Sequence, residues 1–167
     1  GGPPGGTIVT TGGAKNLTSV TLELGGKSQT IVEETADIKN AAKMIAWGKF
    51  ANNGQICIAP DYVFVHESKR QEFSEAIQKQ LSEFYGAKPE NSESYARIVN
   101  EKHFDRVKSY IDDAARKGAK IIADGKENRA EKFIAPTIVE DAPLDSELMK
   151  NEIFGPVLPI HTYKHLE

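Results

Sequence analysis

Cys57 is the single cysteine of this 167-residue chain, and it is the residue best suited to act as a nucleophile. It lies in the run FANNGQICIAP (residues 50–60), where a long amphipathic pattern ends and before a strand-like pattern begins. A thiolate attacks carbon electrophiles, and backbone amides at a turn can both activate a thiol and bind an oxyanion. A lone cysteine is more often a buried and inert hydrophobe, so the assignment depends on its surroundings.

Two further runs place a carboxylate beside glycines that favour turns. TLELGGK contains Glu23, 34 residues before Cys57, and NEIFGP contains Glu152, 95 residues after it. A thiol with a carboxylate base can serve a hydrolase, an acyltransferase or an aldehyde oxidation through a thioester, and the residues alone do not choose among these. No histidine lies near Cys57 in the sequence, which disfavours a papain-like protease. Taken singly, Glu23 would be an exposed charge and Phe154 a core aromatic. Only the joint pattern of the motifs favours a functional role for these two residues.

The composition of the chain argues against several other classes of protein. The chain has 24 acidic and 21 basic side chains, and the basic ones are dispersed, so nucleic acid and anionic membrane surfaces are not expected partners. No apolar run approaches the roughly 20 residues that a membrane span needs. The four histidines are scattered, so we expect no metal site. A single cysteine and the lack of a signal-peptide pattern predict a cytoplasmic protein.

Strand patterns alternate with helix patterns along most of the chain. Gly1 to Gly6 are too rich in glycine and proline for a regular element, and a weak helical pattern follows over residues 8–17. Strands are expected over residues 20–24, 29–32, 62–65, 120–123, 133–139 and 157–163, and helices over residues 38–50, 68–84, 102–117 and 145–150.

Strands separated by long helices need crossover connections. The sequence therefore predicts an α/β fold with an open, mainly parallel sheet and helices on both faces. Sites in such sheets form in loops at the carboxyl ends of strands, where we expect Glu23 and Cys57 to meet.

The three motifs LELGGK, NGQIC and NEIFGP, in this order and at these separations, resemble the signature set of the NAD(P)-dependent aldehyde dehydrogenase superfamily. The resemblance implies that Cys57 attacks the aldehyde and that Glu23 activates the water that hydrolyses the thioester. It implies that Glu152 holds the nicotinamide ribose of NAD or NADP and that Phe154 packs near the nicotinamide. Gly25, in the first motif, is expected at the cofactor because a glycine permits close approach.

The run CIAPDY (residues 57–62) is similar to the run that follows the cysteine in the family branch that acts on fatty and aromatic aldehydes. By this resemblance, the partner is a small-molecule aldehyde, and the whole enzyme is expected to be a homo-oligomer.

The resemblance also predicts how the chain is divided. Residues 1–6 are expected to be a flexible tail or tag remnant, and residues 7–167 the catalytic domain without the N-terminal cofactor domain and the oligomerisation arm. The upstream asparagine that completes the oxyanion hole and the lysine that binds the adenosine ribose are absent, so we expect little or no dehydrogenase turnover from this chain alone. Two alternatives remain open: a cofactor-independent thiol hydrolase or acyltransferase, and a non-catalytic interaction module.

Overall fold

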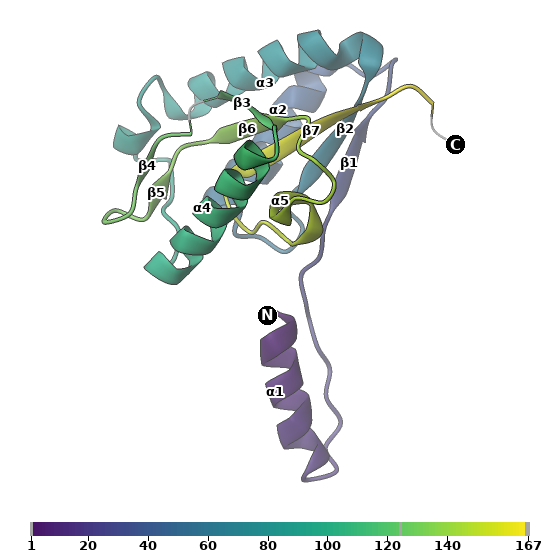
Figure 1. Ribbon diagram of the computed structural model, residues 1–167, viewed down its shortest axis with the longest axis vertical. Helices are drawn as coiled ribbons and strands as arrows, with labels where there is room; N and C mark the ends of the chain where they lie inside the picture. Colours follow the sequence, from purple (N-terminus) through teal and green to yellow (C-terminus); the bar gives the residue numbers. More distant parts are fainter. Residues whose placement is uncertain (1, 124, 166–167) are drawn as a thin grey trace.

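A five-stranded sheet forms the centre of the computed structural model, which describes residues 2–123 and 125–165 (Figure 1). The helices are α1 (Pro3–Ala14), α2 (Ile38–Phe50), α3 (Arg70–Tyr85), α4 (Glu101–Arg116) and α5 (Glu147–Lys150), with 3-10 turns η1 (Ala51–Gly54), η2 (Glu67–Lys69) and η3 (Pro89–Asn91). The strands are β1 (Gln29–Val32), β2 (Tyr62–His66), β3 (Lys120–Ala123), β4 (Glu127–Asn128), β5 (Phe133–Ile134), β6 (Thr137–Glu140) and β7 (Val157–Tyr163).

The strand order in the sheet is β1-β2-β7-β6-β3. The β1–β2, β2–β7 and β6–β7 pairs are parallel, and β3 joins β6 in the antiparallel sense at the edge. The short strands β4 and β5 form a separate antiparallel pair. The predicted open and mainly parallel sheet is confirmed.

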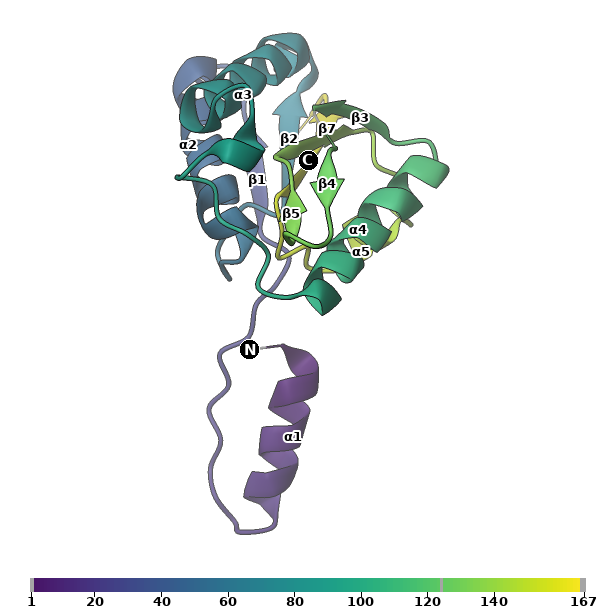
Figure 2. The same ribbon diagram turned by 90° about the vertical axis from the view of Figure 1, so that its left-hand side faces the viewer.

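Helices cover both faces of this sheet, as predicted (Figure 2). Helices α2 and α3 pack on one face over a buried cluster that includes Phe50, Phe73 and Leu158. Helices α4 and α5 pack on the other face over a second cluster that includes Phe104 and Ile153. Helices α2, α3 and α4 each present one apolar stripe to the sheet, which is the arrangement that their periodicity predicts.

Helix α2 shows how the sequence builds an element that positions the site. The Asp37 carboxylate caps the helix by accepting a hydrogen bond from the backbone N–H of Asn40 (3.1 Å). Ala42, Ala46 and Phe50 are buried along one face. The helix therefore runs from a fixed start to the residues that lead into the cysteine motif.

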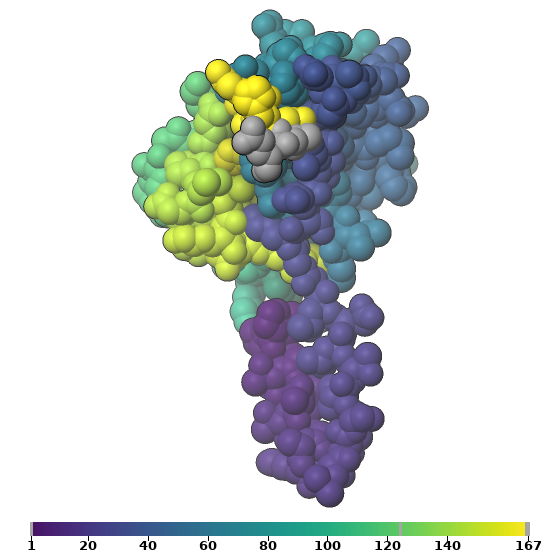
Figure 3. Space-filling view, turned by 90° about the vertical axis from the view of Figure 1, so that its right-hand side faces the viewer, coloured from purple at the N-terminus to yellow at the C-terminus, as the bar shows by residue number. Residues whose placement is uncertain are grey.

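The N-terminal arm (residues 3–24) projects from the sheet domain (Figure 3). It consists of α1 and an extended segment that returns along it, and a Cβ on Gly6 would lie 3.2 Å from the Leu22 side chain. The expectation of an irregular segment over residues 1–6 is therefore wrong from Pro3 onward, and Gly1 lies outside the described residues. Proline is suited to the first turn of a helix because its φ is already helical and its missing N–H would have had no partner there.

Two of the predicted strands also differ from the elements that the structure contains. Residues 20–24 are extended but form no strand, because no neighbouring strand is present beside them in the described chain to complete a ladder. The expected strand over residues 133–139 is divided into β5 and β6 by Ala135 and Pro136. Proline cannot donate to a ladder, which explains the division.

No helix within residues 2–123 and 125–165 has both the length and the apolar character needed to cross a bilayer. The same residues contain no group of three or more histidine, cysteine, aspartate or glutamate side chains placed to hold a metal ion.

Candidate active site

The three motifs lie together at the amino ends of neighbouring strands. Residues 22–27 precede β1, residues 53–57 precede β2, and residues 151–156 precede β7. Because β2 lies between β1 and β7 and is parallel to both, these amino ends meet at one edge of the sheet. The expectation that Glu23 and Cys57 meet at the carboxyl ends of strands is wrong. The strand predicted over residues 20–24 would have ended near Glu23, but it does not form.

Cys57 occupies an exposed turn. A hydrogen bond from the Ala59 N–H to the Ile56 carbonyl (3.0 Å) closes this turn and leaves Cys57 and Ile58 at its central positions. Within residues 2–123 and 125–165, neither the Cys57 nor the Ile58 backbone N–H makes a hydrogen bond to another backbone group. The thiol is thus accessible and has two backbone donors near it.

Consecutive residues with positive φ lead from α2 into the cysteine turn. Asn52 has φ 46° and Asn53 has φ 60°, and Gly54 follows with φ 73°. Asparagine and glycine occupy this left-handed region more readily than other residues do. The Gln55 side chain then donates to the carbonyl oxygens of Asn52 (3.0 Å) and Arg97 (3.1 Å), which ties the turn to the loop before α4.

Gly54 lies directly against the backbone of the third motif. A Cβ at this position would be 2.3 Å from the carbonyl oxygen of Gly155 and 3.1 Å from that of Lys49. Both neighbours are backbone atoms, so neither can rotate away. This contact holds the cysteine motif against residues 151–156.

Gly54→Ala should therefore destabilise the protein more than a loss of glycine at an open position. Gly118 also has a positive φ (100°), but a Cβ there would have nothing within 4 Å. We expect Gly118→Ala to cost about 1–2 kcal/mol from backbone strain alone. Gly54→Ala should cost about 1–3 kcal/mol more, because the contact with Gly155 must also open. Urea unfolding of both variants measures the difference, and equal losses would contradict the close approach.

Gly25 and Glu152, from the first and third motifs, are in contact. A Cβ on Gly25 would lie 2.1 Å from one Glu152 carboxylate oxygen and 2.5 Å from the other. The Glu152 side chain is half-buried, and Phe154, two residues on, has φ 45°. The structure thus brings together Gly25 and Glu152, two of the three residues that the resemblance places at the cofactor.

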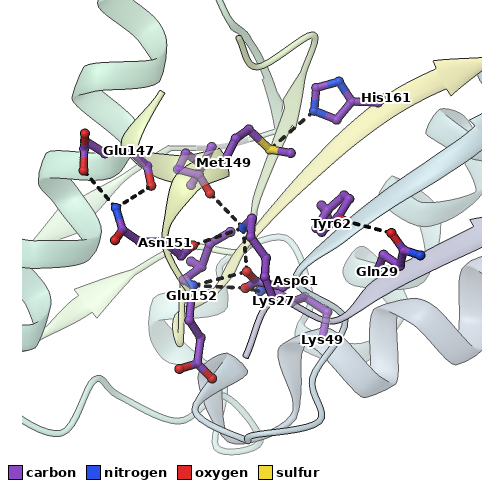
Figure 4. A network of polar contacts seen from close by, with 12 residues as sticks. Lys27, Gln29, Lys49, Asp61, Tyr62, Glu147, Met149, Asn151, Glu152 and His161 are labelled. Atoms are coloured by element: carbon purple, nitrogen blue, oxygen red, sulfur yellow. Dashed lines mark hydrogen bonds and ion pairs between the residues drawn. The ribbon is translucent and has the colours of Figure 1, made fainter. Parts of the chain in front are cut away.

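An ion pair and its hydrogen bonds join the first motif to the third motif and to the loop that follows the cysteine turn (Figure 4). Lys27 Nζ lies 2.6 Å from Asp61 Oδ2 and also donates to the carbonyl oxygens of Leu148 (2.9 Å) and Asn151 (3.1 Å). The Asp61 carboxylate in turn accepts a hydrogen bond from the Ile153 N–H (3.0 Å). Lys27 thus ties the segment before β1 to the loop before β2 and to the segment before β7.

This ion pair limits how far apart the two candidate catalytic residues can lie. Glu23, whose side chain is exposed, is four residues before Lys27, and Cys57 is four residues before Asp61. A four-residue segment spans at most about 14 Å. Glu23 and Cys57 therefore lie on two short segments that start from one anchor.

Lys49, on the last turn of α2, completes the network. It is fully buried, and its Nζ is 3.6 Å from Asp61 Oδ1 and has no hydrogen-bond partner within the described residues. Burial lowers the pKa of Lys49 from 10.5 to about 8, while the nearby carboxylates of Asp61 and Glu152 act in the opposite direction. Lys49 is thus a charged group held at a considerable desolvation cost.

The stability of the protein should therefore depend on the titration of Lys49. Between pH 8 and 10.5 the unfolded chain binds this proton more tightly than the folded chain, so stability rises with pH. We expect the free energy of unfolding to rise by roughly 1–3 kcal/mol over this range relative to Lys49→Met. Urea unfolding at several pH values tests this, and parallel curves for the two proteins would contradict it.

Arg106, on α4, holds the third motif from its other side. Its guanidinium donates to the carbonyl oxygens of Glu152 (3.3 Å), Ile153 (2.8 Å) and Phe154 (3.4 Å). These three carbonyls belong to a segment without regular structure, so the guanidinium supplies bonds that a helix or sheet would otherwise provide.

Sequence reasoning missed Lys49, Asp61 and Arg106. Asp61 lies in the CIAPDY run, but nothing in its spacing indicates that it pairs with Lys27. The signal for Lys49 is its place on the apolar stripe of α2, one residue before Phe50, where a lysine must be buried.

The sequence profile described as the aldehyde dehydrogenase family matches residues 1–167. The chain belongs to the aldehyde dehydrogenase family.

Relatives in this family extend well beyond the chain. It is 46% identical over 162 residues to 4,4'-diaponeurosporen-aldehyde dehydrogenase of Staphylococcus aureus, covering 97% of this chain and 35% of that protein. It is 44% identical over 162 residues to the dimeric NADP-preferring aldehyde dehydrogenase of Rattus norvegicus, with the same two coverages. The chain thus spans about a third of the length of these aldehyde dehydrogenases.

Solved structures likewise match this chain over only about a third of their own length. A substrate-bound structure of Staphylococcus aureus AldH superposes with a TM-score of 0.91 at 44% identity, over 98% of this chain and 35% of that one. Betaine aldehyde dehydrogenase of Staphylococcus aureus, in complex with NAD+, gives a TM-score of 0.86 at 25% identity, over 98% and 34%. The fold of this chain is therefore that of one part of an aldehyde dehydrogenase.

Proposed function

We propose that this chain is the catalytic part of an NAD(P)-dependent aldehyde dehydrogenase, with Cys57 as nucleophile and Glu23 as general base. The observation that carries the proposal is the meeting of the three motifs at one sheet edge, joined by the Lys27–Asp61 ion pair and by the contact of Gly25 with Glu152. The exposed turn of Cys57 at this edge makes its thiol accessible to a small substrate.

The Cys57 residue carries out the first step of the proposed reaction. Its thiolate attacks the aldehyde carbon, a carbon–sulfur bond forms, and the electron pair of the carbonyl moves to oxygen. The backbone N–H groups of Cys57 and Ile58 are available to stabilise this oxyanion. Loss of hydride from the same carbon then leaves a thioester on Cys57.

Glu23 acts in the second step. Its carboxylate takes a proton from water, and the resulting oxygen nucleophile attacks the thioester carbon. The carbon–sulfur bond breaks, the acid is released, and the thiolate of Cys57 is restored. Exposure of the Glu23 side chain is compatible with this role because it leaves room for a water molecule.

Glu152 and Phe154 would hold the cofactor. The absence of a side chain on Gly25 leaves a space that the Glu152 carboxylate enters, and this carboxylate can accept hydrogen bonds from ribose hydroxyls. Phe154 offers an aromatic face two residues away. When bound, an NAD or NADP nicotinamide would accept the hydride that leaves the substrate carbon. These residues fit the nicotinamide end of such a cofactor.

We propose further that this chain alone has little or no dehydrogenase activity and that the rest of the cofactor site comes from the additional length that its relatives have. The N-terminal arm carries exposed Ile8, Val9 and Leu17, and Leu17 is 97% exposed. An apolar surface of this kind favours packing against another part of an enzyme or against a second subunit. The branch-specific run at residues 57–62 supports a fatty or aromatic aldehyde as substrate.

The proposal is tested by following NADH or NADPH formation and ester hydrolysis separately. We expect ester hydrolysis that depends on Cys57 from this chain, and aldehyde oxidation once the chain is part of a protein of the length of its relatives. Ester turnover that requires Cys57 while the longer protein shows no dehydrogenase activity would favour the thiol hydrolase instead. Loss of neither activity in Cys57→Ala would refute a catalytic role for this residue.

A further inference from the structure

We propose that Asp61 is a positioning residue that sets the third motif relative to Cys57. The inference rests on the proposed function and deepens it, because it assigns a role to a residue outside the three motifs. Asp61 is only 3% exposed, although it is a charged side chain in a loop between the cysteine turn and β2. A buried carboxylate is retained only where partners compensate for its lost hydration.

Asp61 has partners in the first motif, in the third motif and on α2. Its carboxylate accepts hydrogen bonds from Lys27 Nζ (2.6 Å) and from the Ile153 N–H (3.0 and 3.4 Å), and it lies 3.6 Å from Lys49 Nζ. Its own backbone N–H donates to the Ser28 carbonyl (2.7 Å). One residue therefore connects the segment before β1, the end of α2 and the segment before β7.

The bond to Ile153 acts on the residues proposed to hold the cofactor. Ile153 lies between Glu152 and Phe154, and its own side chain is fully buried in the core beneath α4. Its N–H is held by Asp61, while the carbonyl groups around it are held by Arg106. A shift of the Ile153 N–H would move both Glu152 and Phe154, because they are its covalent neighbours.

The same residue also limits the position of Cys57. Asp61 follows Cys57 by four residues, and Ala59 between them is buried. The cysteine turn therefore ends two residues before the carboxylate that holds the third motif. Figure 4 shows Lys27, Lys49 and Asp61 converging there, while the Glu152 carboxylate points away from them.

The test compares Asp61→Ala with Asp61→Asn in the chain as it exists. The asparagine keeps an oxygen that can accept the Ile153 N–H, whereas the alanine does not. We expect Asp61→Ala to slow acylation of Cys57 by an activated ester by about 10²-fold, since small displacements of reacting groups have effects of this size. Asp61→Asn should restore the rate to within about threefold of wild type, a difference that corresponds to less than one hydrogen bond.

Asp113→Ala is the matched control. The Asp113 carboxylate also accepts a backbone N–H, from Glu147 (2.8 Å), and pairs with a lysine, Lys117 (3.2 Å), but it holds neither Ile153 nor the cysteine turn. The Asp113→Ala substitution should lower the free energy of unfolding without changing the rate of Cys57 acylation. Amide hydrogen exchange should show faster exchange at Ile153 in Asp61→Ala and at Glu147 in Asp113→Ala.

Equal acylation rates for wild type and Asp61→Ala, or equal losses in Asp61→Ala and Asp113→Ala, would overturn the positioning role. Failure of the proposed function has a different signature. If Cys57→Ser hydrolyses the ester as fast as the wild-type chain does, Cys57 is not the nucleophile. The hydrogen-exchange rate of the Ile153 amide still reports on the role of Asp61 in that case.

Discussion

Replacing Cys57 by serine should reduce ester hydrolysis by this chain on the order of 10³-fold or more. Serine keeps the size and the exposed turn, but its hydroxyl is far less nucleophilic than a thiolate. A burst of p-nitrophenol from p-nitrophenyl acetate measures acylation directly. The burst should be present in the wild type and absent in Cys57→Ser.

Two controls separate chemistry from folding in this experiment. The urea unfolding curve of Cys57→Ser should match that of the wild type, because the side chain is exposed. Mass spectrometry of the wild-type chain during the burst should show one acetyl group on the peptide that contains Cys57. An undiminished burst in Cys57→Ser, or an acetyl group located elsewhere, would refute the nucleophile assignment.

Glu23→Gln should separate the two halves of the reaction. The glutamine cannot accept a proton from water, so hydrolysis of the thioester should slow by about 10²–10⁴-fold while acylation of Cys57 continues. The expected result is a normal burst followed by a much slower steady state. Pre-steady-state measurement of p-nitrophenol release distinguishes the two phases.

Glu72→Gln provides the matched control for this variant. Glu72 is an exposed carboxylate on α3 whose partner is Lys69, and the same loss of charge there should change neither phase. If Glu23→Gln instead reduces the burst and leaves the later rate unchanged, Glu23 acts on the thiol and not on water. An unchanged profile would show that another group activates the water.

Much of the fold follows from local patterns in the sequence. The stripe from Ile38 to Phe50 has the period of a helix, and the continuous apolar run over residues 62–65 has the character of a buried strand. Both elements form as predicted, with helices on both faces of a mainly parallel sheet. Such elements are predictable because each periodicity can bury an apolar face in only one type of structure.

The errors occurred where local patterns depend on distant partners. Residues 20–24 have the composition of a strand, but a strand also needs a neighbour for its backbone groups, and the described structure places none there. The start of α1 at Pro3 was missed because the glycines of residues 1–6 suggested an irregular segment, although a first-turn proline and contacts with Leu22 support the helix.

Residue types, their order and their separations were enough to predict the family, the three motifs and the candidate nucleophile. The folded chain was needed to show that the motifs meet at the amino ends of β1, β2 and β7, and that Asp61 and the buried Lys49 lie where those segments meet. An ion pair between residues 34 positions apart, as Lys27 and Asp61 are, has no periodicity along the chain that could reveal it. It exists only once parallel strands have brought those segments to the same edge.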